Sequence, residues 1–288
     1  MIIMNNKIIL TADCSCDLPE ELKERYQVKT LPVHLLLEDV EYIDNVEIFA
    51  EDLFKAYHER KVLPKTAAIN STEYYEVFKE WTDQGYDVVH VNIGSAISCG
   101  YQNAVIASQE FDNVYVIDSW NLSSGFGFIV IKAAECIAKG MSAKEVKEEA
   151  EKYREKVHSS FILDTLTFMQ AGGRCSSVAA IGASLLNLKP CIEVDNTSGG
   201  MSAAKKYRGK LEKVLEKYVI EKLSDYENID TSRIFITYSS LDDESIIDRL
   251  KEIIEGQMHF DEIVANRACC NVATHCGPNT LGILFMTK

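Results

Sequence analysis

The sequence predicts an α/β protein of two domains. The N-terminal domain should have a mostly parallel sheet with helices on both faces, and the C-terminal domain a mixed sheet. Through the first half, short and almost continuously apolar segments alternate with helical segments, which is typical of parallel strands that are buried on both faces. The chain has 288 residues, 47% of them apolar, enough for about two cores. We place the boundary at residue 158, which gives domains 1–158 and 159–288.

In the first half, apolar runs predict the strands and capping residues predict where helices begin. Pro19 suits the first turn of a helix, where its missing N–H would have no partner. Asn70 with Glu73, and Ser142 with Glu145, form capping boxes that open two further helices. The predicted strands are 7–11, 28–37, 87–93 and 114–118, and the predicted helices are 19–26, 49–61, 72–84, 101–110, 126–139 and 143–157.

After residue 158 the pattern becomes richer in strands. The segment Asp195–Gly200, D-N-T-S-G-G, consists of turn-forming residues and predicts a hairpin, which makes this sheet mixed. There is no repeat and no Pro/Ser-rich linker, so we expect the halves to pack together. The predicted strands are 161–163, 188–194, 201–207, 233–238, 262–267 and 282–286.

The net charge of −14 limits the partners of this chain. Phosphate backbones and anionic membrane surfaces would repel it, so we expect no nucleic acid partner and at most a transient membrane contact. The N-terminal segment M-I-I-M-N-N-K-I-I-L lacks the basic and apolar regions of a signal peptide. No uncharged apolar run approaches the ~18 residues of a membrane span. We therefore expect a soluble, cytoplasmic protein.

The nine cysteines do not follow the spacing of a metal or redox motif. Their number is odd and no C-x-x-C occurs, which argues against a zinc ribbon or a thioredoxin motif. Convergence of the Cys14-x-Cys16 pair with a C-terminal group on a metal stays open as an alternative, although the spacing does not support it. That group is Cys269, Cys270, His275 and Cys276. We favour reduced thiols that act as small apolar residues, with no metal and no cofactor.

The segment V-V-H-V-N-I-G-S-A-I-S-C-G-Y-Q, residues 88–102, runs from a buried strand into small and hydroxyl residues. Neither Ser95 nor Ser98 has the flanking glycines of a G-x-S-x-G nucleophile elbow. Cys99 stands at a helix start, but no histidine has a recognisable relation to it. Phosphate-binding motifs are absent as well, because Gly125-Phe126-Gly127 lacks a third glycine and no Walker lysine occurs.

Ser95 and Ser98 lie where a parallel strand ends and a helix begins, which is the usual ligand-binding edge of such sheets. Free N–H groups at a helix start favour a carboxylate or a phosphate. Ser98 would be equally well explained as a helix cap.

Four ordered motifs make the chain similar to the DegV family of bacterial fatty-acid-binding proteins, from Ile8 to the C-terminus. The motifs are L-D-T-L-T-F-M-Q-A-G-G-R (163–174), L-L-N-L-K-P (185–190), K-K-Y-R-G (205–209) and T-H-C-G-P-N-T-L-G (274–282); V-I-D-S (116–119) also fits. The resemblance implies that the chain binds a long-chain fatty acid in an inter-domain tunnel. It also implies that a separate fatty acid kinase, not this protein, phosphorylates the carboxylate.

The resemblance places the carboxylate clamp in two segments, T-A-A-I-N (66–70) and N-I-G-S-A-I-S-C-G-Y-Q (92–102). Thr66 and Ser98 match the family hydroxyls, and Ser95 lies beside them. Both segments depart from the family patterns T-S-Q-P-S and I-S-S-x-L-S-G-T-Y-Q, so the head-group pocket is altered and another ligand is conceivable. Arg174 and His275 align with family residues near the ligand head, and Arg208, in the basic K-K-Y-R-G-K segment, with the face presumed to meet the kinase.

Candidate residues for the acyl tunnel lie in the apolar second half, although each would also fit an ordinary core. They are Phe161, Leu163, Leu166, Phe168, Met169, Ile181, Leu185 and Leu186. Two alternatives to the carrier remain open. One is an acyl-processing enzyme that uses Cys99 or Ser98, and the other is a carrier of a different amphiphilic lipid.

Overall fold

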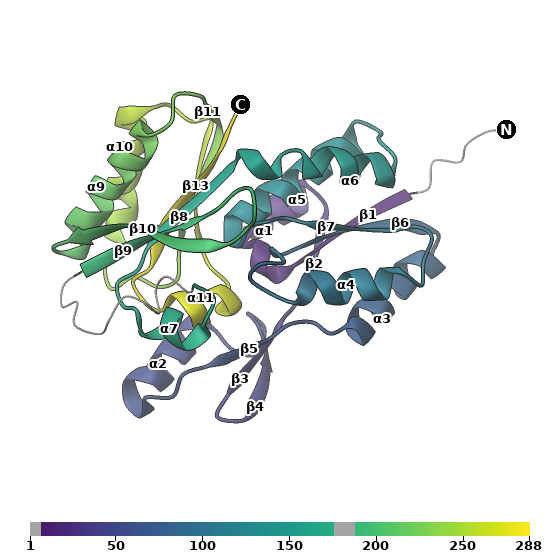
Figure 1. Ribbon diagram of the computed structural model, residues 1–288, viewed down its shortest axis with the longest axis horizontal. Helices are drawn as coiled ribbons and strands as arrows, with labels where there is room; N and C mark the ends of the chain where they lie inside the picture. The colour runs from purple at the N-terminus through teal and green to yellow at the C-terminus, as the bar shows by residue number, and fades with distance from the viewer. Residues whose placement is uncertain (1–6, 176–187) are drawn as a thin grey trace.

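The computed structural model describes residues 7–175 and 188–288, which form two large sheets with helices packed on and between them (Figure 1). The first sheet is parallel, in the order β2-β1-β6-β7. Its strands are β1 (Lys7–Asp13), β2 (Val28–Leu31), β6 (Tyr86–Asn92) and β7 (Val114–Asp118). The predicted parallel sheet of the first half is therefore confirmed.

Helices cover both faces of this sheet because both sets of alternating side chains are apolar. Val88 packs on one face with helices α3 and α4, whereas its neighbour Val89 packs on the other face with α5 and α6. Both predicted capping boxes are present, at the starts of α3 and α6. The helices of this part are α1 (Glu20–Arg25), α3 (Ser71–Asp83), α4 (Gly100–Ser108), α5 (Ser123–Ala138) and α6 (Ala143–Glu151).

The second sheet is mixed, in the order β10-β9-β8-β13-β11-β12, with β11 and β12 as its parallel pair. Helices α9 (Leu211–Ser224) and α10 (Ser245–Gln257) pack on one face. The other face packs on α5, which also contacts the first sheet. The strands are β8 (Val157–Ile162), β9 (Leu188–Val194), β10 (Met201–Arg208), β11 (Ile229–Tyr238), β12 (Glu262–Arg267) and β13 (Leu281–Thr287).

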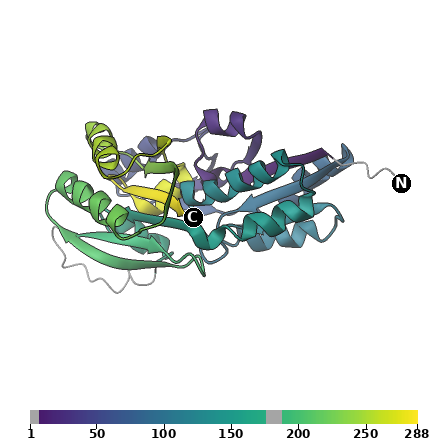
Figure 2. The same cartoon turned by 90° about the horizontal axis from the view of Figure 1, so that it is seen from above.

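Helix α5, labelled in Figure 1, lies between the two sheets, which Figure 2 shows from above. Its residues 123–131 are all buried. Two glycines on this helix allow close contacts. A Cβ at Gly127 would approach the carbonyl oxygen of Cys16 to 2.7 Å, and one at Gly125 would approach Ser159 Oγ to 2.2 Å. Gly125 therefore allows close packing against the second half and Gly127 close packing within the first half, at points where a side chain would not fit.

A small third sheet, in the order β4-β3-β5, extends from the first half toward the second. With helix α2 (Ala50–Arg60) it packs against α11 (Cys270–Cys276) of the second half. Phe54 of α2 also lies against Phe168 of α7 (Thr167–Gly172), with ring centroids 5.6 Å apart. The strands are β3 (His34–Leu37), β4 (Val40–Ile43) and β5 (Lys65–Ala67).

The structure corrects the sequence prediction at several boundaries. The strand predicted at 28–37 is divided between two sheets, because Pro32, which has no N–H for a ladder, follows β2. The helix predicted at 143–157 ends at Glu151, and Val157 already belongs to β8. Residue 158, our proposed domain boundary, is thus the second residue of the first strand of the second sheet.

Candidate functional site

A cavity of about 160 Å³ lies at the carboxyl ends of β1 and β6, where the small third sheet and α11 meet the first sheet. Ligands commonly bind at this edge of an α/β sheet. The wall combines hydroxyl, carboxylate, guanidinium and imidazole groups with apolar side chains. We call this cavity the polar pocket; its lining is Asp13, Ser15, Val33, Thr66, Ala67, Ala68, Ile69, Tyr74, Ile93, Ile97, Ser98, Cys99, Gly100, Arg174, Asn271 and His275.

Thr66 and His275 join the two halves of the chain across the polar pocket. Thr66 Oγ1 and His275 Nε2 are 3.0 Å apart and form a hydrogen bond. Burial, reinforced by the positive charge of Arg174, lowers the pKa of His275 to about 4. The second ring nitrogen, Nδ1, is buried and has no hydrogen-bond partner among residues 7–175 and 188–288. The neutral ring therefore retains hydrogen-bonding capacity on its Nδ1 side.

Ser98 lies where both sequence-based interpretations place it, at the start of α4 and on the wall of the polar pocket. Its Oγ accepts a hydrogen bond from the backbone N–H of Gly100, at 3.2 Å, and so caps the start of α4. The side chain also lines the polar pocket. Ser95 is exposed and lies outside the lining, and its backbone N–H donates to Asp118 Oδ1 at 3.1 Å. The structure thus brings Ser98, but not Ser95, to the candidate site.

Arg174 and Cys99 lie at the exposed side of the pocket. Gly173, in the left-handed region with φ 67°, ends α7 and redirects the chain to Arg174. Cys99 is exposed, and its polar contact is with Asn103 Nδ2 at 4.0 Å. An amide is not a general base, so this contact does not activate the thiol.

A buried polar network forms the floor of the pocket, and the sequence analysis missed it. Asp13 Oδ1 accepts a hydrogen bond from the Tyr74 hydroxyl at 2.7 Å, and Asp13 Oδ2 accepts one from Asn92 Nδ2 at 3.2 Å. Burial and the neighbouring carboxylate of Asp13 raise the pKa of Tyr74. Asp13 and Asn92 are the last residues of β1 and β6. A polar residue at the carboxyl end of each strand was the signal available in the sequence.

Two apolar cavities, each of about 30 Å³, continue inward from the polar pocket. The nearer cavity shares five lining residues with the pocket: Ile93, Ile97, Arg174, Asn271 and His275. The deeper cavity shares four with the nearer one: Leu122, Phe161, Val272 and Cys276. Shared lining residues therefore link the polar pocket, through the two apolar cavities, to the contact between α5 and the second sheet.

The predicted tunnel residues occupy different places. Phe161 lines both apolar cavities and Met169 lines the nearer one. Leu163 and Leu166 belong to the core around α5, and Phe168 packs against Phe54 and Tyr57 of α2. The remaining three, Ile181, Leu185 and Leu186, lie outside the described residues.

Arg208 lies far from the polar pocket along an edge strand. It is the exposed last residue of β10, whereas Met201, the first residue, lines the nearer apolar cavity. Seven steps of a strand correspond to roughly 23 Å. Arg208 is therefore exposed at the surface, at the end of β10 that lies away from Met201 and the nearer cavity.

In residues 7–175 and 188–288, the side chains that could together hold a metal ion are Cys14, Asp44 and Cys269. None of these three residues lines the polar pocket. No helix in this part of the chain is both long and apolar enough to cross a membrane.

Known proteins resemble this chain over almost its whole length. The model of the DegV family, described as uncharacterised proteins, matches residues 7–288. A DegV domain-containing protein of Clostridium perfringens is 30% identical over 285 residues, covering 98% of this chain and 99% of that protein. A Thermus thermophilus DegV family structure, described by its fatty acid binding, is 29% identical, with a TM-score of 0.88 over 98% of this chain and 100% of its own. Bacillus subtilis DegV, described as a fatty acid binding protein, is 25% identical, with a TM-score of 0.82 and coverage of 98% and 100%.

Proposed function

The chain belongs to the DegV family, and we propose that it binds a long-chain fatty acid between its two halves. The observation that carries this proposal is the series of shared walls, in which a polar pocket continues into apolar cavities. The Thermus thermophilus and Bacillus subtilis relatives, which have the same fold, are described as fatty acid binding. An amphiphile with one anionic end matches this arrangement of walls.

The carboxylate would bind in the polar pocket. The hydroxyls of Thr66 and Ser98 and the guanidinium of Arg174 line it and can each donate a hydrogen bond. Hydrogen bonds to a charged group each contribute about 1.5–3 kcal/mol. Ala67 and Ala68 replace polar family residues here, which leaves the pocket fewer donors.

The acyl chain would supply most of the affinity, at ~0.8 kcal/mol for each buried CH₂ group. Each apolar cavity is small beside the polar pocket, about 30 Å³ against about 160 Å³, so we expect lining side chains to move when a long chain enters. Met169 and Met201 line the nearer cavity, and methionine is the apolar residue best able to change rotamer at low cost. We therefore expect binding to widen the route mainly at these two side chains.

The phosphorylation step would belong to a separate fatty acid kinase. The sequence contains no P-loop, so the chain lacks the motif that would bind ATP for this step. Among the described lining residues, the hydroxyls with a possible general base beside them are Thr66, next to His275, and Tyr74, next to the carboxylate of Asp13. Arg174 and Cys99 are exposed at the pocket, so a bound carboxylate would be accessible to a partner enzyme from this side. The protein would then act as a carrier without a catalytic residue of its own.

Mass spectrometry of the lipid extracted from the purified protein tests the proposal. We expect a fatty acid with a free carboxylate, and an added panel of medium- and long-chain fatty acids should exchange with it. A different amphiphile in the extract would support the alternative carrier. No lipid, together with no binding across the panel, would refute a lipid-binding function.

A further inference from the structure

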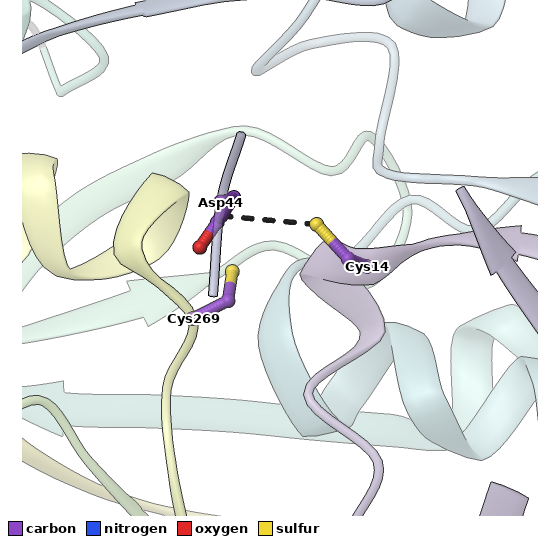
Figure 3. A group of neighbouring side chains, drawn as sticks. All are labelled: Cys14, Asp44 and Cys269. Atoms are coloured by element: carbon purple, nitrogen blue, oxygen red, sulfur yellow. Dashed lines mark hydrogen bonds between the residues drawn. The ribbon is translucent and has the colours of Figure 1, made fainter. Parts of the chain in front are cut away.

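Three segments that are distant in the sequence meet at a cluster of two thiols and a carboxylate (Figure 3). Cys14 lies in the short turn after β1, Asp44 follows β4, and Cys269 precedes α11. One ligand-type atom from each side chain lies within 4.8 Å of the other two. Asp44 and Cys269 are each 2% exposed, and Cys14 is half-buried.

We propose that Cys14, Asp44 and Cys269 bind a zinc ion and leave its fourth coordination position open. Thiolate sulfur and carboxylate oxygen are both common zinc ligands, at about 2.3 and 2.0–2.2 Å from the metal, and ligands of a tetrahedral ion then lie about 3.5 Å apart. Cys14 Sγ and Asp44 Oδ2 are 3.7 Å apart. The spacing already suits a shared metal, while two thiols favour zinc over magnesium or calcium.

The carboxylate of Asp44 is held in a fixed orientation by the chain beyond Cys269. Oδ1 accepts the backbone N–H of Cys270 and Oδ2 accepts that of Asn271, each at 2.8 Å. Outer contacts of this kind orient metal ligands and strengthen metal binding. On the side facing the cluster, Oδ2 accepts the weak S–H donor of Cys14, and a metal would replace that proton.

A cavity of about 460 Å³ leads to the cluster, and Cys14, Asp44 and Cys269 all contribute to its wall. The cavity gives an ion a route from solvent and gives room for a water molecule at the fourth position. Two thiolates, one carboxylate and Zn²⁺ have a net charge of −1, and the basic residues Lys23 and Arg267 line the same cavity. Binding would release the two thiol protons to solvent, without any change of oxidation state.

Zinc would connect the first sheet, the small third sheet and the second half of the chain. A ligand that binds only the folded state stabilises it, so zinc should raise the melting temperature. The three ligands line a different cavity from the polar pocket, so zinc and a fatty acid would occupy separate sites.

Metal titration of the reduced, chelator-treated full-length protein tests the inference. With zinc alone, we expect one ion per chain, measured by competition with a chromophoric chelator. Removing a direct ligand should weaken binding more than the roughly 10–100-fold cost of losing an outer contact, so Cys14→Ser and Cys269→Ser should each lose at least about 100-fold. Cys191→Ser is the matched control, since this thiol is also buried but lies in β9, and it should bind zinc as the wild type does.

Cobalt(II) gives a second readout that needs no variant, because thiolate ligands produce an intense sulfur-to-cobalt charge-transfer band. Absence of that band in the wild type would overturn the proposal, as would equal zinc binding by wild type, Cys14→Ser and Cys269→Ser. Peptide mapping without reductant tests the alternative that Cys14 and Cys269 form a disulfide. A Cys14–Cys269 disulfide, combined with no zinc uptake by the reduced protein, would replace the metal site with a redox pair.

Discussion

Thr66 and His275 are 209 positions apart in the chain, yet their side chains share a hydrogen bond at the candidate site. His275 is neutral at pH 7 because burial and the charge of Arg174 lower its pKa to about 4. Ser98, a third polar residue of the pocket, is partly engaged in capping α4. At the scale of residues, the pocket is therefore organised before any ligand binds, which reduces the entropy cost of binding.

Ser98→Ala should weaken fatty acid binding by about 10–100-fold, since it removes one hydrogen bond of about 1.5–3 kcal/mol to a charged group. Cys99→Ala, one residue away and exposed, should leave binding within about twofold. Isothermal titration with a medium-chain fatty acid measures both. A turnover that the wild type shows and Cys99→Ala abolishes would instead favour the acyl-processing enzyme.

His275 should make the folded protein less stable in acid. An unfolded histidine binds a proton below about pH 6.5, whereas the folded one does so only near pH 4, so stability is complete above 6.5 and falls as the pH decreases toward 4. Between pH 7 and 4.5 this corresponds to about 2–3 kcal/mol. Over this pH range, the free energy of unfolding measured in urea should therefore decrease less for His275→Gln than for the wild type, by the same amount. The pKa of His158 is also lowered by burial, but this residue is present in both proteins, so its contribution cancels in the comparison.

At the scale of elements, the small third sheet and α2 determine how the first half meets the second. Phe54 of α2 packs edge-on against Phe168 of α7, and Tyr57 packs against the same ring with centroids 4.8 Å apart. Aromatic contacts of this geometry add about 0.5–1.5 kcal/mol beyond the burial of their area. The helix thus supports α7, which leads directly to Arg174.

Phe54→Ala should lower the free energy of unfolding by about 3–5 kcal/mol, because it removes a buried aromatic ring from this contact. Phe49, at the start of the same helix, is 50% exposed and offers a matched control. Phe49→Ala should change stability by no more than about 0.5 kcal/mol. Chemical denaturation measures the free energy of unfolding of both variants. Similar losses of stability in the two variants would mean that α2 does not support α7 through Phe54.

At the scale of the whole molecule, charge is distributed unevenly. The chain carries a net charge of −14, while the edge strand β10 ends in the basic segment 205–210. Arg208 is exposed there, and the strand leads back to Met201 at the apolar cavity. A local basic surface on an acidic protein favours an acidic partner and disfavours association through other faces. We expect Arg208 to act on the partner, and not on the fatty acid.

Arg208→Ala should retain fatty acid but slow acyl phosphate formation by a fatty acid kinase from the same organism, about 5–30-fold for a loss of 1–2 kcal/mol. Lipid retention and acyl phosphate formation are measured for Arg208→Ala and Ser98→Ala. Arg249→Ala, which removes an exposed arginine from α10, is the control and should affect neither. If Arg208→Ala loses lipid as severely as Ser98→Ala, Arg208 belongs to the ligand site; if neither changes either measurement, the assignment of both residues fails.

The sequence by itself determined the fold class, most elements and part of the site. Alternating apolar runs and capping boxes depend on neighbours within a few residues, which is why β9 and β12 match their predicted ranges and both boxes form. The resemblance to the DegV family selected Thr66, Ser98, Arg174 and His275, which line one pocket.

Only the tertiary structure decided which distant residues meet. Pro32 divides a predicted strand between two sheets, and the resulting third sheet brings Asp44 to Cys14 and Cys269. Ser95, three residues from Ser98, faces solvent because the turn before α4 directs it away from the pocket. Cys14 and Asp44 are 30 positions apart, and Asp44 and Cys270 are 226 positions apart. No regular spacing in the sequence predicts such contacts, because they depend on how the sheets and helices pack.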